Sequence, residues 1–235
     1  EWLDDLQVRY GVPVLVDNDA NLGALAERWW GVGLGVDDFV YIKVATGIGA
    51  GQIVGGEIYR GATGIAGEVG HLVIDPLGPK CPCGLNGCLT TFVGSQALIE
   101  RASALVEKHP ESALAGSDPT VESIEDAAVA GDPLARQIVH EAAEHLGIAV
   151  AGIVSMLNPA MVIVGGGLAR VGDLLLDPLR DVIGRRSLIT SVAGTQVRTS
   201  ELGEHATAQG AATIVLQAAL DDPRLFPKPQ GVRSQ

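Results

Sequence analysis

The cysteines of this chain gather in one short segment, at Cys81, Cys83 and Cys88. His71 precedes them in the same stretch, which reads GEVGHLVIDPLGPKCPCGLNGCLTT. Three thiolates and one imidazole are the ligand set of a tetrahedral zinc site whose four protein ligands leave no position open for water. Two glycines before Cys88 permit the tight reversal that brings it back towards the other thiols. The pattern therefore predicts a structural zinc site with His71, Cys81, Cys83 and Cys88 as its ligands.

A disulfide, or three unrelated core thiols, would be the alternative explanation of this cluster. An odd number of cysteines leaves one unpaired, and a bridge between Cys81 and Cys83 would be strained by its short span. Zinc is therefore the interpretation we adopt. Thiols in a ligand pattern rather than a disulfide framework also favour a reducing compartment, so we expect the protein in the cytoplasm.

A second group of polar residues follows an apolar run. Residues 12–16 (VPVLV) are typical of a buried parallel strand, and Asp17, Asn18 and Asp19 come directly after it. The carboxyl end of such a strand is where open α/β sheets place their ligands. Asp19 could act there as a general base towards a substrate hydroxyl. Asn18 or Asp19 could equally cap the helix predicted for residues 20–30.

Glu68 stands three residues before His71, in the sequence GEVGH. In a helical turn this offset places both side chains on one face, so a carboxylate and a metal-held imidazole can converge on one polar ligand. A solvated surface acid is the alternative for Glu68. The apolar residues LVI that follow His71 are expected to form a strand.

Two glycine-rich turns could hold phosphate. The first, TGIGAG, contains Thr46, Gly47 and Gly49 and joins two predicted hairpin strands, residues 39–45 and 48–54. A third strand is expected over residues 57–60. The exposed backbone N–H groups of such a turn can cradle phosphate, although a glycine-rich hairpin needs no ligand.

The second turn comprises Gly165, Gly166 and the glycine after them. It follows a predicted buried strand, residues 161–164, and precedes a helix expected from about residue 168. The order strand, glycine turn, helix is typical of a nucleotide-binding corner. Close packing of a helix on a sheet can require the same glycines.

The remaining segments are mostly helical. Residues 95–108 and 206–220 are expected to form helices, 109–120 a surface loop, 197–202 a last strand, and the tail beyond residue 220 is expected to be irregular. Asp132 and Pro133 pair a good N-cap with proline at the first helical position. A stripe of apolar residues at three- and four-residue steps then predicts a long helix packed on the sheet, ending near Asn158. Its members are Leu134, Ile138, Ala142, Leu146, Ala149, Ile153 and Met156.

Composition limits the kinds of partner. The formal net charge is −12 and no basic cluster stands out, so these residues are not expected to grip DNA themselves. No signal peptide is visible, and the longest apolar run is too short to cross a bilayer, so we expect no membrane partner. The chain begins without methionine at Glu1 and is expected to be part of a longer protein.

The motifs VDNDAN, TGIGAG, GEVGH, CPCGLNGC and VIVGGG, in this order, resemble the ROK family, which contains sugar-responsive repressors and sugar kinases. The resemblance covers essentially the whole chain. It implies an α/β fold that is actin-like and hexokinase-like (ribonuclease H-like), with two lobes around a cleft, assembled as a homodimer or homotetramer. It also implies a sugar site lined by Asn18, Asp19, Glu68 and His71. In a kinase, Asp19 would be the base, and ATP with Mg²⁺ would lie against Thr46, Gly47, Gly49, Gly165 and Gly166.

The sequence departs from the family pattern in three places. Thr90 stands where members commonly have a glutamate that contacts the sugar, which puts sugar affinity or identity in question. Ala45 stands where kinases often have glycine, before the Thr-Gly of the first turn, and its methyl could crowd ATP. The amino-terminal Asp-x-Gly-Gly-Thr phosphate hairpin of the kinases is not in the sequence. Half of an ATP site and much of the small lobe are therefore expected to be missing.

These features favour the sugar-sensing and oligomerising part of a ROK transcriptional regulator, which would reach DNA only through a winged helix in a missing amino-terminal segment. Residues 1–36 would be the remainder of the small lobe and residues 37–204 the large lobe with the zinc motif. Residues 205–235 would be a helix that returns to the small lobe, followed by an irregular tail. An ATP-dependent kinase of a hexose or amino sugar is the alternative.

Overall fold

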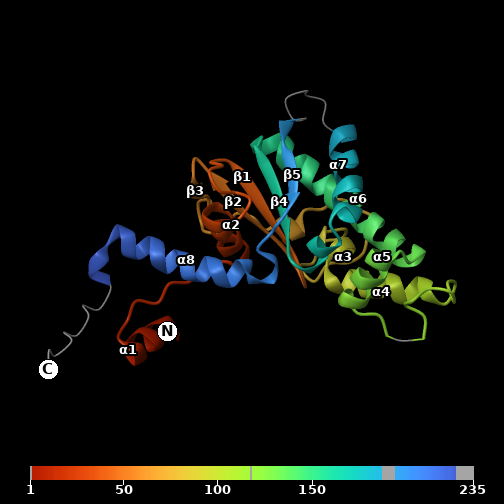
Figure 1. The fold of residues 1–235 in the computed structure, drawn as a ribbon, viewed down its shortest axis with the longest axis horizontal. Coiled ribbons are helices and arrows are strands. Elements are labelled where there is room, and N and C mark those ends of the chain that lie inside the picture. Colours follow the sequence, from red (N-terminus) through yellow and green to blue (C-terminus); the bar gives the residue numbers. More distant parts are fainter. Residues whose placement is uncertain (1, 117, 187–193, 226–235) are drawn as a thin grey trace.

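A mixed five-stranded sheet forms the centre of the protein (Figure 1), in the strand order β3-β2-β1-β4-β5. The computed structural model describes residues 2–116, 118–186 and 194–225. Strands β1, β2 and β3 form an antiparallel meander, and β1, β4 and β5 run parallel. The bounds of the strands are β1 Phe39–Val44, β2 Ile48–Val54, β3 Glu57–Ile58, β4 Met161–Gly165 and β5 Gln196–Thr199.

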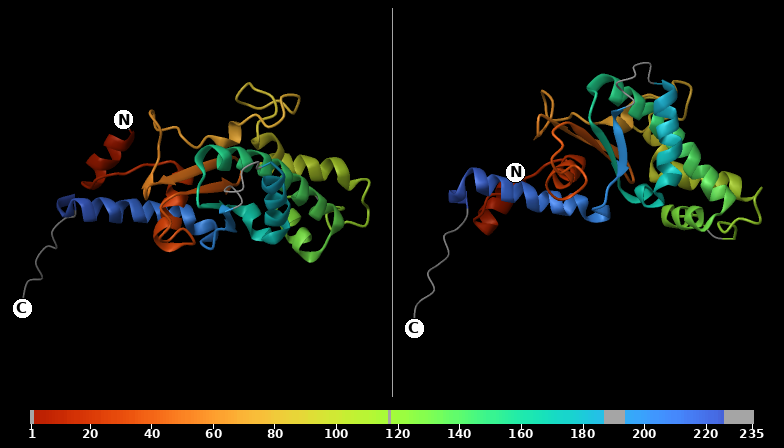
Figure 2. Two further views of the ribbon diagram at one scale, coloured as in Figure 1. Left: turned by 90° about the horizontal axis from the view of Figure 1, so that it is seen from above. Right: turned by 45° about the horizontal axis from the view of Figure 1, so that its top comes forward.

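Helices cover both faces of this sheet. The α-helices are α1 Trp2–Tyr10, α2 Asp19–Trp30, α3 Thr90–Val93, α4 Ser95–Val106, α5 Val121–Ala130, α6 Pro133–Leu157, α7 Asp173–Arg186 and α8 Ala206–Asp221. Short 3₁₀ helices are η1 Val69–His71, η2 Gly167–Val171, η4 Gly203–His205 and η5 Pro223–Leu225. Figure 2 shows α4 to α7 gathered on one side of the sheet, with α2 and α8 on the other.

The alternation of side chains along β1 explains this division. Val40, Ile42 and Val44 are buried with the apolar residues of α4, α5, α6 and α7. Phe39 and Tyr41 point to the other face, where they pack with Ala24 of α2 and residues of β4 and α8. A strand covered on both faces reads as a continuous apolar run, as this one does apart from a single lysine.

Helix α6 is the long helix predicted from the sequence. The Asp132 side chain accepts a hydrogen bond from the N–H of Ala135 at 2.9 Å, Pro133 occupies the first turn, and Asn158 ends the helix in the left-handed conformation (φ 46°). The predicted apolar stripe is buried except for Met156, which is 79% exposed. This residue was assigned wrongly because residues 155–157 are all exposed, so the last turn of α6 projects beyond the elements on which the helix packs.

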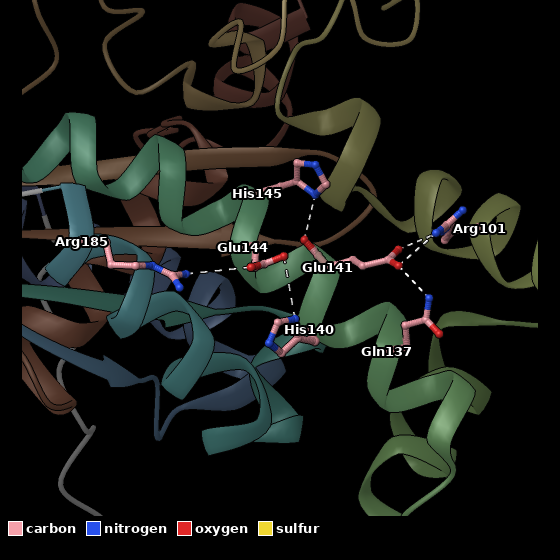
Figure 3. A network of polar contacts seen from close by, with 7 residues as sticks. All are labelled: Arg101, Gln137, His140, Glu141, Glu144, His145 and Arg185. Atoms are coloured by element: carbon pink, nitrogen blue, oxygen red, sulfur yellow. Dashed lines mark hydrogen bonds and ion pairs between the residues drawn. The ribbon is translucent and has the colours of Figure 1, made fainter.

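Polar contacts also join α6 to its neighbours (Figure 3). Glu141 accepts two hydrogen bonds from Arg101 of α4, at 2.7 and 2.9 Å, and Glu144 lies 3.9 Å from Arg185 of α7. By length and apolar composition α6 is the one described helix that could span a membrane. Its apolar residues instead form much of the protein core.

Two predicted strands are wrong. Residues 12–16 form no strand, and Val12, Leu15 and Val16 are exposed. A strand needs a neighbour to take its backbone hydrogen bonds, and none of the five described strands pairs with this segment. Residues 72–74 also form no strand: Val73 makes one isolated antiparallel bridge, to Cys88.

Several boundaries differ from prediction. The helix after the glycine turn begins as the 3₁₀ helix η2 before α7, β5 ends at Thr199, and β3 is only two residues long. Helix α5 was not predicted, although Thr120 and Ser123 form a capping box and Gly131 ends the helix in the left-handed conformation. The final helix lies where it was expected, whereas most of the predicted tail, residues 226–235, falls outside the described residues.

Candidate functional site

The amino-terminal end of α2 brings polar side chains to one edge of the sheet. The Asn18 side chain accepts a hydrogen bond from the N–H of Ala20 at 2.8 Å, which confirms the predicted cap. Asp17 accepts hydrogen bonds from Asn21 at 2.8 Å and from Nε of Arg60 at 3.0 Å. Burial opposes the charge of Asp17, but these hydrogen bonds outweigh it and lower the pKa of this carboxyl group. Asp19 is therefore not needed as the cap and is free to make other contacts.

Asp19 pairs with a lysine that sequence reasoning missed. Nζ of Lys43 lies 2.7 Å from Oδ2 of Asp19; the lysine side chain is 25% exposed and the aspartate 56%. Lys43 stands near the end of β1 and is the only charged residue of that strand. The sequence does contain a signal for this pair, because a single lysine lies in the apolar run FVYIKVA. A cation within a buried strand needs a partner.

Glycines in β2 and in the segment before His71 bring these elements together. A Cβ on Gly51 would lie 2.3 Å from the backbone oxygen of Ala20, so α2 can approach β2 only over glycine. Cβ atoms on Gly67 and Gly70 would lie 1.9 and 2.4 Å from backbone oxygens of β2. Both α2 and the η1 turn therefore rest directly on the first half of β2.

Glu68 and His71 share the η1 turn. Glu68 occupies the N-cap position and His71 the last position of this 3₁₀ helix, and both residues are exposed. Glu68 has a φ of −69° and a ψ of 48°, outside the helical conformation, so a common face for the carboxylate and the imidazole stays a prediction.

The four predicted metal ligands gather at one place. One ligand atom each from His71, Cys81, Cys83 and Cys88 lies within 4.8 Å of the others. Nδ1 of His71 is 3.6 Å from Sγ of Cys81, and the Sγ atoms of Cys83 and Cys88 are also 3.6 Å apart. No disulfide joins the cysteines. The four side chains that gather here are thus the four that the sequence spacing predicted.

The chemistry of this cluster suits a metal that prefers thiolates. The backbone N–H of Leu85 is the main group that lowers the pKa of Cys83 to about 7, whereas burial raises the pKa of Cys88. A thiol with a lowered pKa is readily available as the thiolate that binds metal. The loop is tightly closed, because a Cβ on Gly87 would lie 1.5 Å from the backbone oxygen of Asp75. The donor set and its enclosure fit a tetrahedral Cys₃His site.

Helix α3 connects the cysteine loop to the turn between β1 and β2. It begins at Thr90, two residues after Cys88, and ends at Val93, with Gly94 as its C-cap. A Cβ on Gly94 would lie 2.7 Å from the backbone oxygen of Thr90 and 3.0 Å from that of Thr46. The N–H of Ser95 also donates to the backbone oxygen of Ala45 at 3.2 Å. These contacts therefore couple the position of the cysteine loop, through α3, to the backbone position of Thr46.

A cavity of about 380 Å³ lies beside the predicted nucleotide corner; of the five residues predicted to hold nucleotide only Thr46 lines it, together with Gly167 of the second glycine turn. Its charged lining residues are Glu122, Glu125, Glu204 and Arg170. Arg170 is engaged by Glu125, at 3.1 Å, and by Asp126, at 3.2 Å. Glu125 is only 2% exposed, and burial raises its pKa. The cavity thus offers a triphosphate three carboxylates and one cation that is already paired.

Packing accounts for the glycines of this corner. A Cβ on Gly165 would lie 2.3 Å from the hydroxyl of Tyr41. Gly166 has a φ of 88°, and a Cβ there would lie 2.1 Å from the backbone oxygen of Val44. A Cβ on Gly49 would contact Ala20, whereas a Cβ on Gly47 would meet no atom within 4 Å. Gly47 alone among these four faces open space beside Thr46.

Comparison with known proteins decides the family. A sequence model described as ROK family matches residues 2–218. The chain belongs to the ROK family. It is 37% identical over 223 residues to the putative xylose repressor of Caldicellulosiruptor sp. (strain Rt8B.4), covering 93% of this chain and 56% of the repressor. The chain thus spans about half the length of that relative.

Solved ROK structures confirm the α/β, hexokinase-like fold. A ROK family glucokinase from Streptomyces griseus, in complex with glucose and AMPPNP, matches 92% of this chain and 72% of its own, with a TM-score of 0.84 and 36% identity. A ROK family transcriptional regulator, a homologue of the E. coli MLC protein, matches 95% of this chain and 56% of its own, with a TM-score of 0.86 and 34% identity. Kinases and regulators of the family are thus similar to this chain to the same degree.

Proposed function

We propose that this chain is the sugar-sensing and oligomerising part of a ROK transcriptional regulator. The contact between Lys43 and Asp19 is the observation that carries the proposal. A general base needs a carboxylate whose lone pair is free to take a proton from the substrate hydroxyl. Here the carboxylate that would serve in a kinase is already bound to an ammonium group.

The nucleotide corner supports the same choice. Phosphoryl transfer depends on cations and N–H groups arranged around the phosphates. The cavity beside Thr46 is instead lined by Glu122, Glu125 and Glu204, with its one arginine engaged in ion pairs. Such a lining repels a polyphosphate but does not affect a neutral sugar bound near α2.

The sugar site in this proposal comprises Asn18, Asp19, Glu68 and His71. Carboxylates, an amide and an imidazole supply the hydrogen-bond acceptors and donors that sugar hydroxyls require. Zinc, held by His71, Cys81, Cys83 and Cys88, would fix one ring nitrogen of the histidine and so orient the other towards the sugar. The glucose in the Streptomyces griseus glucokinase complex supports a sugar as the ligand class.

Sensing follows from a difference in affinity. A sugar that binds one arrangement of the protein more tightly shifts the population towards it, by no more than that difference in binding free energy. Contacts between copies of the chain, as a homodimer or homotetramer, would pass this shift to DNA-binding segments outside the present sequence. The formal net charge of −12 fits a protein that reaches DNA only through such a segment.

A DNA-binding assay with the full-length protein tests the proposal. Operator binding should change at least about tenfold when the cognate sugar is added, which corresponds to about 1.4 kcal/mol of coupling. Glu68→Ala should abolish the response to sugar but leave sugar-free DNA binding unchanged. DNA binding that ignores every sugar of a broad panel would contradict the proposal.

A sugar kinase is the second candidate, because Asp19 is half exposed at the corner and Gly47 leaves open space beside Thr46. A kinase would transfer the γ-phosphoryl group of ATP to a sugar hydroxyl and release ADP, and Asp19→Asn would lower that rate by about 10²-fold or more. A coupled assay for ADP on the full-length protein measures this directly. Sugar-dependent turnover that is lost in Asp19→Asn would overturn the regulator proposal.

A further inference from the structure

Lys43 lies between two glycines in the sheet. Its partner on β2 is Gly49 and its partner on β4 is Gly165. Residues paired across strands project on the same face of a sheet. Neither neighbour has a side chain to obstruct the lysine, so its stem can cross the face of the sheet towards the amino-terminal end of α2.

The ammonium group of Lys43 is incompletely used. An ammonium has three N–H donors, and the contact with Oδ2 of Asp19 at 2.7 Å engages one of them. Among the described residues, Lys43 makes no other side-chain hydrogen bond. The lysine side chain as a whole is one-quarter exposed. Two donors are therefore available to a ligand that approaches Asp19.

A sugar hydroxyl matches this pair because it donates one hydrogen bond and accepts others. It can donate to the carboxylate of Asp19 while its oxygen accepts from the ammonium of Lys43, since the two groups are in contact. We propose that Lys43 is a specificity-determining residue of the sugar site, binding the same hydroxyl that Asp19 binds. This inference rests on the proposed function, which places Asp19 in that site.

The same contact has a chemical consequence. A hydroxyl oxygen whose lone pair accepts from an ammonium is a weaker nucleophile, and a carboxylate bound to that ammonium is a weaker base. Lys43 thus favours reversible binding of the sugar over transfer of a phosphoryl group to it. The hydroxyl that Lys43 recognises is the one that a kinase would phosphorylate.

Calorimetric titration with a hexose panel and the monodeoxy analogues of the tightest sugar tests the inference. Lys43→Met should weaken binding of the parent sugar by about 10- to 100-fold, as expected for loss of a charged hydrogen bond to a ligand. Lys43→Arg, which keeps the cation, should recover part of the affinity. Lys108→Met, a matched change in the exposed turn that follows α4, should leave the affinity within about twofold.

The deoxy series separates a direct contact from a structural effect. One deoxy sugar, which lacks the contacted hydroxyl, should bind wild-type protein and Lys43→Met with the same affinity, while the others should lose as much as the parent. Equal loss for every sugar, or no loss for any, overturns the inference.

The same titrations test the proposed function separately. If sugar binds wild-type protein, Glu68→Ala removes binding and Lys43→Met does not weaken it, only the inference about Lys43 falls. If the wild-type protein binds no sugar of the panel, the proposed function and the inference fall together. Thermal melting of each variant tests whether its loss of sugar affinity comes from a loss of folding.

Discussion

Glu27 of α2 is a fully buried carboxyl group that the candidate site does not use. Ser200 donates a hydrogen bond to its Oε1, and the N–H of Val32 donates to its Oε2 at 2.9 Å. Burial raises the pKa of Glu27, because the two hydrogen bonds do not fully replace the lost hydration. The charged form is therefore less favoured in the folded chain than in the unfolded chain.

This shift predicts a specific pH dependence for Glu27→Gln. A group with a raised pKa contributes its full stability below its unfolded pKa, near 4.5, and loses that contribution as the pH rises. Glutamine keeps an acceptor and does not ionise. In urea titrations, the free energy of unfolding of the variant, relative to wild type, should therefore increase as the pH rises above about 4.5 and should level off once the pH passes the raised pKa of Glu27 in the folded chain.

Glu141 provides the opposite case as a control (Figure 3). The hydrogen bonds from Arg101 lower the pKa of Glu141, so its contribution is present at neutral pH and is lost as the pH falls. Glu141→Gln should be destabilised at pH 7, and its difference from wild type should shrink only as the pH falls below about 4.5 and through the lowered pKa of the folded chain. If the difference in free energy of unfolding between each variant and wild type did not change with pH, the pKa shifts assigned to Glu27 and Glu141 would be contradicted.

At the scale of elements, the turn that carries Glu68 and His71 depends on Gly70. A Cβ there would lie 2.4 Å from the backbone oxygen of Ile48, so Gly70→Ala must push η1 away from β2. We expect a loss of stability of about 1–3 kcal/mol and a fall in sugar affinity of about tenfold or more. Urea unfolding and calorimetric titration measure the two effects.

Gly47→Ala is the matched control for that substitution. Gly47 lies on the neighbouring turn, where an added Cβ would meet no atom within 4 Å. Its stability should stay within about 0.5 kcal/mol of wild type, and its affinity for a sugar should be unchanged. If Gly70→Ala behaves like Gly47→Ala, the contact between η1 and β2 does not position the site.

The cysteine loop supports a second prediction at this scale. Purified protein should contain a single zinc ion per chain, and a chelator should lower the melting temperature by several degrees. Because α3 links Cys88 to the backbone of Thr46, hydrogen exchange should accelerate in α3 and in the turn at Thr46 as well as in the loop. Acceleration in the loop alone would show that the metal does not support α3. Restoring zinc should reverse both changes.

Elements with strong local signals could be predicted from the sequence. Helix α6 has a capping aspartate, a proline at its start and an asparagine at its end, and the β1–β2 hairpin has glycine between apolar runs. Metal ligands could be predicted because few residue types bind zinc. Residues 12–16 have the composition of a strand, but strand formation depends on a neighbour, which composition does not reveal. The pairing of Lys43 with Asp19 likewise depends on how α2 packs on β1.

At the scale of the whole molecule, helices distant in sequence complete one layer beside the sheet (Figure 1). Helices α2 and α8 pack against each other, and Nε1 of Trp30 donates to the hydroxyl of Thr213 at 2.7 Å. A Cβ on Gly210 would lie 1.8 Å from the backbone oxygen of Leu22, so the two helices are in direct backbone contact. The hydroxyl of Thr207 also reaches the backbone oxygen of Asp19, at 3.3 Å. Helix α8 therefore supports the end of α2 that carries the site.

Helix α1 stands apart from this layer. None of its residues is buried, and Trp2, Val8 and Tyr10 are exposed. A helix of nine residues that buries none of them is marginal in water. In hydrogen exchange at low concentration, residues 2–10 should therefore exchange within seconds, while α2 and α6 stay protected. Protection of α1 that appears only at about tenfold higher concentration would assign its apolar side chains to a contact between copies of the chain. Protection at both concentrations would contradict the expectation, because no packing in the described chain accounts for it.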